Sequence, residues 1–260
     1  MQTQEINFHI TALDSMKKYP ESLFYKGDTS LLERKKISIV GSRKPNQYAR
    51  AKTEELARKL SLAGICIVSG GALGVDAVAH SAAGTHNTIV VAATGLDKRY
   101  PTINAGLIAE VEERGLVLSQ FKDKTPSTKY NFVIRNEVVV ALGDVLIVTY
   151  ADLKSGTMRS VEYALKMGKK IYVLAHRIGE SEATNKLLSE GKAEAIYDID
   201  TFVKKFSDVK IVEKKKSDAF LEFCENNPSY EEAVSAFPTR VFEAELSGEI
   251  EIRNSQVYVL

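Results

Sequence analysis

Four glycine-containing segments each follow a short apolar run, and their residue types suit phosphate binding. Glycine lets main-chain N–H groups approach an anion without a Cβ in the way. A helix start adds unpaired donors, serine and threonine add hydroxyls, and arginine adds a bidentate cation. One such loop can be a purely steric turn, whereas several on one sheet edge favour a phosphate site. The segments are Gly41–Ser42–Arg43, Ser69–Gly70–Gly71 continuing to Asp76, Thr94–Gly95–Leu96–Asp97, and Ser155–Gly156–Thr157.

The two commonest nucleotide-binding patterns are absent from these loops. The segment after Val40 lacks the G-x-G-x-x-G spacing of dinucleotide-binding folds, and the chain contains no G-x-x-x-x-G-K-[ST] phosphate loop. Dinucleotides and nucleoside triphosphates are therefore not the expected ligands.

A second candidate segment interleaves cations, amides and aromatic rings between Lys129 and Asn136. It contains Phe132 and Arg135, and single-stranded nucleic acid is held by cations that track its backbone and by aromatic rings that stack its bases. The alternative is structural, with Phe132 in the core and the lysine solvated. On its own the segment favours that alternative.

Asp76 and His80 are spaced i, i+4 on an expected helix and could hydrogen-bond to each other. A triad with Ser69 is conceivable, but no oxyanion hole or oriented base accompanies it. A structural pair is the favoured interpretation. The four histidines and two cysteines show no ligand spacing, so we expect no catalytic residue, metal or cofactor.

Short apolar strands alternate with helices of about ten to fifteen residues, which indicates βαβ units and a parallel sheet. The strands are apolar throughout, as expected when helices cover both faces. We therefore predict an α/β, Rossmann-like, doubly wound and mainly parallel fold. The expected strands are Ile37–Val40, Ile65–Val68, Thr88–Ala93, Leu116–Leu118, Val145–Val148 and Lys170–Leu174, with helices near 46–63, 75–83, 132–142 and 158–167.

The end of the chain predicts a small separate domain. Three short helices precede two alternating segments around Arg253–Ser255, a pattern typical of a winged-helix-like domain. Ser229 with Glu232 three residues later predicts a capping box. The expected organisation is a short N-terminal segment over 1–35, a Rossmann-like domain over 36–208, a charged linker over 209–216 and the winged-helix-like domain over 217–260.

Charge divides unevenly between these parts of the 260-residue chain. Residues 217–260 hold nine acidic and two basic residues, a net charge of −7, and the remainder holds 33 basic and 25 acidic residues, a net charge of +8. A polyanion is therefore expected on the first domain. No apolar run is long enough to cross a membrane, and the N-terminus shows no signal-peptide pattern, so a cytoplasmic location without membrane association is expected.

The segments together resemble the DNA processing protein A family (DprA, also called Smf) from Ile39 to about Phe202. Five blocks in the same order and at similar spacing make a chance similarity improbable. They are Ile39–Arg43; Ile67–Asp76 with Ala79 and His80; Gly95–Asp97 with Tyr100, Pro101 and Asn104; Phe132 with Arg135 and Asn136; and Ser155–Thr157.

The resemblance implies a non-enzymatic protein that binds single-stranded DNA, protects incoming strands during natural transformation and helps to load the RecA recombinase. It also implies a homodimer through the Rossmann-like domain. The family's pocket maps phosphate contacts onto Arg43 and Lys129 and base stacking onto Phe132. The full expected DNA-binding set is Gly41, Ser42, Arg43, Ser69, Gly70, Gly71, Lys129, Phe132, Arg135, Asn136, Ser155, Gly156 and Thr157.

Several residues depart from the family pattern. Glu137 stands where many members have arginine, which is expected to remove a cation from the rim of the pocket, and Ala175–His176 replaces a Pro-Gly pair. The acidic C-terminal region is expected to contact a protein or to stabilise the chain rather than to bind duplex DNA.

The alternative function is that of a nucleotide phosphoribohydrolase of the related lysine-decarboxylase-like group. Its signature needs Pro-Gly-Gly-x-Gly-Thr followed closely by Glu. Around Gly156 the chain lacks the proline, the doubled glycine and the nearby glutamate, and the nearest is Glu162.

Overall fold

The computed structural model describes residues 2–207, 219–224 and 226–259. The chain divides into two compact units, Met1–Lys210 and Ile211–Leu260. The predicted linker over 209–216 lies outside the described residues.

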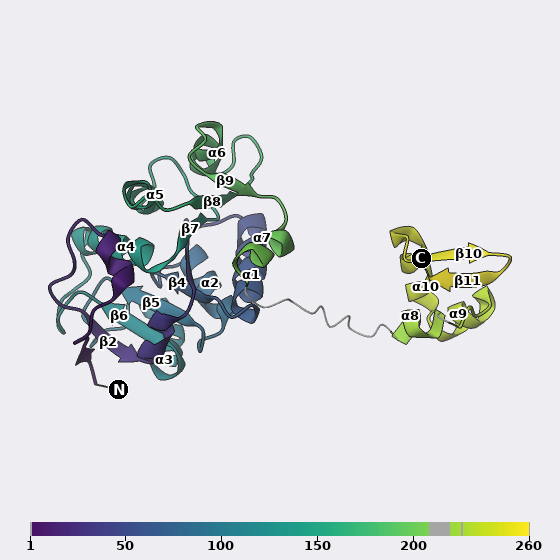
Figure 1. The fold of residues 1–260 in the computed structure, drawn as a ribbon, viewed down its shortest axis with the longest axis horizontal. Helices are drawn as coiled ribbons and strands as arrows, with labels where there is room; N and C mark the ends of the chain where they lie inside the picture. Colours follow the sequence, from purple (N-terminus) through teal and green to yellow (C-terminus); the bar gives the residue numbers. More distant parts are fainter. Residues whose placement is uncertain (1, 208–218, 225, 260) are drawn as a thin grey trace. The chain divides into compact units, whose positions relative to one another are not determined.

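A nine-stranded sheet forms the centre of the first unit (Figure 1). Its spatial order is β1-β2-β6-β5-β4-β3-β7-β8-β9, and all neighbours from β6 to β9 are parallel. Strands β1 and β2 add an antiparallel edge beside β6. The strands are β1 (Gln4–Glu5), β2 (Phe24–Gly27), β3 (Lys36–Val40), β4 (Cys66–Ser69), β5 (Thr88–Ala92), β6 (Leu116–Ser119), β7 (Val145–Val148), β8 (Ile171–Leu174) and β9 (Glu194–Ile196).

Helices cover both faces of this sheet, as the uniformly apolar strands predict. Figure 1 shows α4 and α5 on one side of the strands and α1 and α7 on the other. Along β3, Ile37 and Ile39 face the core under α1, α2 and α7, whereas Val40 faces the core under α4. The helices are α1 (Gln47–Leu62), α2 (Val75–Ala83), α3 (Ala105–Arg114), α4 (Lys129–Leu142), α5 (Thr157–Lys166), α6 (Glu182–Ser189) and α7 (Ile199–Phe206).

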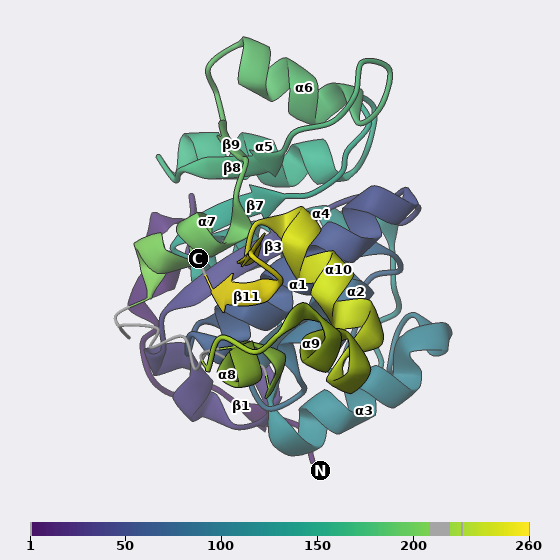
Figure 2. The ribbon, with the colours of Figure 1, turned by 90° about the vertical axis from the view of Figure 1, so that its right-hand side faces the viewer.

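The strand order reverses at β3. From β3 the chain moves outward through β4 and β5 to β6, and then α4 carries it back to β7 on the other side of β3. Strands β8 and β9 continue outward from there, with α5 and α6 at that end of the sheet (Figure 2). The predicted fold class, a doubly wound and mainly parallel α/β sheet, is confirmed.

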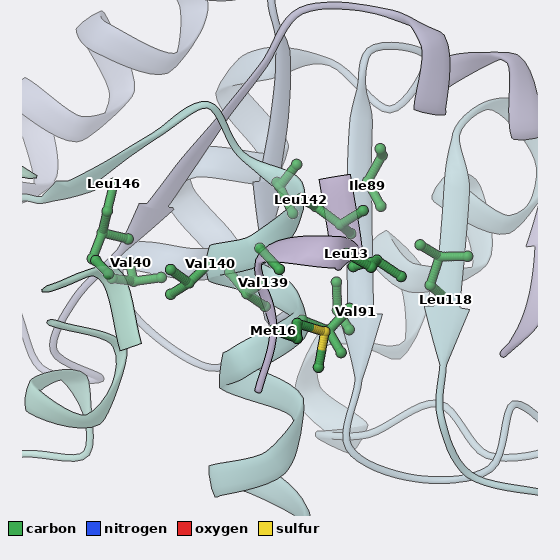
Figure 3. Packing of buried hydrophobic residues seen from close by; sticks show 14 of the residues in the cluster. Leu13, Met16, Val40, Ile89, Val91, Leu118, Val139, Val140, Leu142 and Leu146 are labelled. Carbon is green, nitrogen blue, oxygen red and sulfur yellow. The ribbon is translucent and has the colours of Figure 1, made fainter. Parts of the chain in front are cut away.

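The first 35 residues contribute to the same core as the sheet. The short 3-10 helix η1 (Thr11–Ser15) places Leu13 in contact with the apolar face of α4, and Leu13 is completely buried. Figure 3 shows Leu13 and Met16 among Val139 of α4 and Val91 of β5. Two further 3-10 helices are η2 (Thr29–Glu33) and η3 (Thr102–Asn104).

The second unit contains three helices followed by a hairpin, the succession that the sequence indicates. Within it, the side chain of Ser229 accepts from the N–H of Glu232, and the Glu232 carboxylate accepts from the N–H of Ser229, so the predicted capping box is confirmed. The elements are α8 (Ala219–Cys224), α9 (Tyr230–Ala236), α10 (Pro238–Ser247), β10 (Ile250–Arg253) and β11 (Gln256–Val259).

Two absences hold over residues 2–207, 219–224 and 226–259. No helix there is both long enough and apolar enough to cross a membrane. Those residues also contain no group of three or more histidine, cysteine, aspartate or glutamate side chains that could bind a metal ion.

His80 is a buried neutral group between α2 and β5, and it does not pair with Asp76. The Thr88 hydroxyl donates to the carbonyl of Ile67 (2.8 Å), so it accepts from His80 Nδ1 (2.7 Å). Nε2 is then the unprotonated nitrogen, and it is buried without a partner among the described residues. Burial, together with the positive charge of Arg135, lowers the pKa of His80 to about 3.

This burial predicts acid sensitivity of the first unit. Because the unfolded chain binds a proton at His80 below a pKa of about 6.5 and the folded chain does not, stability is lost as the pH falls from about 6.5 toward 3. At pH 5 the buried, neutral His80 lowers the free energy of unfolding by about 2 kcal/mol relative to its value above pH 6.5. We expect His80→Asn, which can still bond to Thr88, to flatten this part of a urea-unfolding pH series. An unchanged pH slope would show that His80 titrates normally in the folded chain.

Candidate nucleic-acid interface

The carboxyl ends of β3 and β7 meet where the strand order reverses. The loop after β3 leads to α1 on one face, and the loop after β7 leads to α5 on the other. The two loops diverge and leave a crevice, which is where open α/β sheets bind their ligands.

A pocket of about 290 Å³ lies at this position, and we call it the switch-point pocket. It combines the loops after β3, β4 and β7 with one face of α4. Ten of the thirteen predicted DNA-binding residues line it: Gly41, Ser42, Arg43, Gly70, Phe132, Arg135, Asn136, Ser155, Gly156 and Thr157.

The start of α5 provides the anion-binding wall of the pocket. Gly156 is the N-cap residue, and no side chain caps the helix. Within the described part of the chain, the N–H groups of Gly156 and Thr157 make no hydrogen bond, and the Ser155 hydroxyl is buried without a partner. The hydroxyl-bearing Ser160, one turn further along α5, also lines the pocket. Unpaired N–H groups at a helix start attract a phosphate.

Arg43 and Phe132 form the opposite, aromatic part of the pocket. The guanidinium carbon of the exposed Arg43 lies 5.2 Å from the centroid of the Phe132 ring, within cation–π range. The ring of Tyr100 is 5.9 Å away and tilted by 50°. Phe132 is only half-buried, so the interpretation that places it in the core is wrong. Its ring lines the pocket, with the guanidinium carbons of Arg43 and Arg135 at 5.2 and 5.7 Å from its centroid.

Arg135 holds α4 in place rather than reaching solvent. It is 4% exposed, and its Nη1 donates to the carbonyl oxygens of Gly70 and Val91, the latter at 2.6 Å. Its Nε donates to the side-chain oxygen of Asn136 at 3.1 Å. Burial lowers the pKa of Arg135 to about 10. Arg135, one of the expected DNA-binding residues, does line the pocket, but protein oxygens occupy its Nε and Nη1 donors.

Glycine is required at position 70 by this arrangement. A Cβ built on Gly70 would lie 2.2 Å from Nη1 of Arg135, far inside contact distance. The absence of a side chain at Gly70 thus leaves room for the guanidinium of Arg135.

The loop after β3 is locked to its neighbours. The N–H of Ser42 donates to the carbonyl of Tyr150 (2.8 Å), and the carbonyl of Ser42 accepts from the N–H of Val75 (3.1 Å). A Cβ on Gly41 would lie 2.6 Å from Val75, and one on Gly74, where φ is +77°, would lie 2.4 Å from the Ser42 oxygen. The N–H of Ser42 is thus already used within the protein, although Ser42 itself lines the pocket as the sequence predicts.

Asp76 lines the pocket, although it was not among the predicted DNA-binding residues. Its carboxylate accepts from the N–H groups of Gly70 (3.2 Å) and Ala72 (3.3 Å). Burial raises the pKa of Asp76, while the positive charge of Arg135 and the two N–H groups oppose that rise. Asp76 closes the loop after β4. The signal available in the sequence was that Asp76 ends the glycine-rich segment 67–76, which follows a predicted strand.

Three predicted residues lie outside the pocket lining. Ser69 is buried and its hydroxyl donates to the carbonyl of Ile39 at 2.6 Å, which ties β4 to β3. Gly71 has φ +69°, and its carbonyl accepts from the side chain of Asn104 at 3.0 Å. Lys129 is exposed at the first residue of α4, three positions before Phe132.

Glu137 is not on the rim of the switch-point pocket. It lies on another side of α4, where its carboxylate accepts from the N–H of Lys17 at 3.2 Å. The expectation that it removes a cation from the rim is wrong, because a helix turns by about 100° per residue and carries position 137 away from the face of 132, 135 and 136.

The sequence and the fold are both similar to those of known proteins. The family described as DNA recombination-mediator protein A matches residues 5–207. The solved structure of DNA processing protein A from Helicobacter pylori, reported for its single-stranded DNA binding mode, is 41% identical, with a TM-score of 0.77 over 79% of this chain and 95% of that chain. The Streptococcus pneumoniae protein is 30% identical, with a TM-score of 0.73 over 78% and 74%.

The curated relatives are longer than the matched region. Bacillus subtilis DNA processing protein DprA is 32% identical over 190 residues, which is 71% of this chain and 64% of that protein. Escherichia coli protein Smf is 32% identical over 189 residues, 71% of this chain and 50% of that protein. The chain thus spans between half and two thirds of the length of these relatives.

Fold and pocket define a Rossmann-like α/β protein with a crevice at its strand-order reversal, lined by an uncapped helix start. Within that class, the chain belongs to the DNA recombination-mediator protein A family. The resemblance to the DprA/Smf family that the sequence indicates is confirmed.

The two arginines beside Phe132 should differ in their effect on stability. We expect Arg135→Ala to lower the free energy of unfolding by about 2–4 kcal/mol, since two buried carbonyls lose their donor and a cavity opens. Arg43→Ala should change it by less than about 0.5 kcal/mol, because the side chain is exposed. Urea unfolding of both variants measures this, and equal losses would contradict the anchoring role of Arg135.

Proposed function

We propose that this protein binds single-stranded DNA in the switch-point pocket. One phosphate sits at the free N–H and hydroxyl groups of the α5 start, Arg43 contacts the backbone, and a base stacks on Phe132. The observation that carries this proposal is the contact between the exposed Arg43 and the half-buried Phe132 ring, next to an uncapped helix start. The single-stranded DNA binding reported for the Helicobacter pylori relative supports it.

Single strands fit the pocket better than duplex DNA. Stacking on Phe132 needs a base with a free face, which a duplex buries between neighbouring base pairs. The net charge of +8 outside residues 217–260 adds a sequence-independent attraction for the backbone. Lys129, exposed three residues before Phe132, is a further phosphate contact in this proposal.

The wider role extends the recombination-mediator description of the family to which the chain belongs. We infer a recombination mediator of the bacterial cytoplasm that protects incoming strands during natural transformation and helps to load the RecA recombinase onto them. It acts as a homodimer through the Rossmann-like domain. A linker over 209–216 leads to a winged-helix-like domain over 217–260, and that acidic domain contacts a protein or stabilises the chain.

The DNA proposal predicts distinct effects for the cation and the ring. Arg43→Ala should weaken oligo-dT binding about tenfold or more and reduce the slope of log affinity against log salt by about 0.7, since one fewer counterion is released. Phe132→Ala should cost about 1–3 kcal/mol and leave the salt slope intact. Fluorescence anisotropy over a salt series, with duplex of the same length alongside, measures both.

A matched control is Arg114→Ala. Arg114 is also exposed, but it ends α3 just before β6 begins. It therefore lies at the amino ends of the parallel strands, whereas the pocket lies at their carboxyl ends. If Arg43→Ala binds oligo-dT no worse than Arg114→Ala, the pocket assignment is wrong.

The alternative, a nucleotide phosphoribohydrolase, lacks a catalytic carboxylate. Asp76 is the one acidic side chain that lines the pocket among the described residues, and two N–H groups hold it. Glu162 is exposed and pairs with Arg159 at 2.9 Å instead. The protein is therefore proposed to be non-enzymatic.

We expect no release of free base when the protein is incubated with nucleoside monophosphates. Chromatographic detection of base over hours, with Asp76→Asn as a control, tests this expectation. Turnover by the parent that Asp76→Asn abolishes would favour the hydrolase over the DNA-binding protein.

A further inference from the structure

A second pocket, of about 570 Å³, lies beside α4 and has no part in the site described above. We call it the Tyr130 pocket. It is formed by the N-terminal segment before and in β2, the segment after β6, and α4, and the residues that matter here are Lys18, Gln120, Phe121, Lys122 and Tyr130.

Helix geometry relates the two pockets. Tyr130, Ile134 and Glu137 line the Tyr130 pocket, whereas the residues of α4 in the switch-point pocket are 132, 135, 136 and 139. At 100° per residue these sets occupy opposite faces of one helix, whose diameter with side chains is about 10 Å. The pockets therefore flank α4, and its N-terminus lies between them.

That N-terminus is suited to a phosphate. Among the residues that the structure describes, the N–H groups of Lys129 and Tyr130 make no hydrogen bond, and the Thr128 side chain caps only the N–H of Asn131. The exposed Lys129 ammonium stands at the same point. A strand that left Phe132 and crossed the end of α4 would meet these donors and the positive end of the helix dipole.

The Tyr130 pocket itself suits a base rather than a phosphate. Lys18 and Lys122 are balanced there by Glu21 and Glu137, and Lys18 pairs directly with Glu21 at 2.5 Å. Tyr130 is 73% exposed, so most of its ring faces the pocket and solvent, where a base could stack on it.

Two wall residues add to this chemistry. Phe121 supplies a second aromatic side chain. The Gln120 amide oxygen is buried without a hydrogen-bond partner among the described residues, so a group that enters the pocket with an N–H to donate would satisfy it. Each of the four DNA bases carries at least one N–H on its pairing edge. In thymine this is the single imide N–H.

We propose that the Tyr130 pocket is a second base subsite for the same DNA strand, stacked on Tyr130, with the linking phosphate held by Lys129 and the start of α4. This rests on the proposed function, since it extends the strand bound at Phe132. The strand wraps over the end of α4 and places one base on each side of the helix.

Stacking is tested by a pair of substitutions at one position. Tyr130→Ala should weaken binding of an oligo-dT long enough to fill both pockets by roughly 5- to 100-fold, and Tyr130→Phe, which keeps the ring, should bind like the parent. Thymidine monophosphate, a single nucleotide that can fill only one pocket, should lose little with either variant. Tyr197→Ala, which removes an 87% exposed tyrosine from the segment between β9 and α7, is the matched control and should bind like the parent.

Direct contact is tested by fluorescence, because the chain has no tryptophan. Tyr130→Trp introduces a single reporter, and oligo-dT should quench it in a saturable way, whereas Tyr197→Trp should stay unquenched. If Phe132→Ala loses affinity while Tyr130→Ala does not and Tyr130→Trp is not quenched, the second subsite is wrong and the proposed function stands. If the parent binds no single-stranded DNA, the proposed function itself fails.

Discussion

A buried guanidinium fixes α4 against the sheet, and the geometry of the pocket depends on it. Arg135 donates to carbonyl oxygens of Gly70 and Val91, at or near the carboxyl ends of two neighbouring strands. Burying a cation is unfavourable unless its donors are satisfied and its charge is offset, and these carbonyls together with the charge of Asp76 do both. Because α4 must cross from β6 back to β7, this anchor decides where Phe132 lies on the same face of the helix.

The sequence predicted the central strands well and the edge strands poorly. Strands β3 to β8 are short apolar runs because helices bury both their faces, so composition alone identifies them. Strand β9 spans only Glu194–Ile196, and β1 only Gln4–Glu5, and neither is an apolar run. These edges form because a neighbouring strand offers unpaired main-chain groups, and a local pattern carries no record of that neighbour.

The sequence predicted most of the residues that line the candidate site, but not which of them are exposed and which hold the structure together. Arg43 and Arg135 both lie within 6 Å of the same ring, at 5.2 and 5.7 Å, and only burial separates the exposed cation from the structural one. Burial depends on tertiary packing, so the sequence could not assign it. Two other signals were present and overlooked. Thr128 is a typical N-cap residue and starts α4 earlier than predicted, and helical spacing already separates Glu137 from the face of Phe132.

The loops around Ser42 are held by hydrogen bonds, so the pocket walls have little conformational entropy left to lose when a ligand enters. The main chain of Ser42 is bonded to both the segment after β7 and the start of α2, and Gly74 allows the loops to approach to contact distance. A strand that enters the pocket therefore meets walls whose conformational freedom was already lost on folding. In the DNA complex proposed above, ordering the flexible strand is then the main unfavourable term in association.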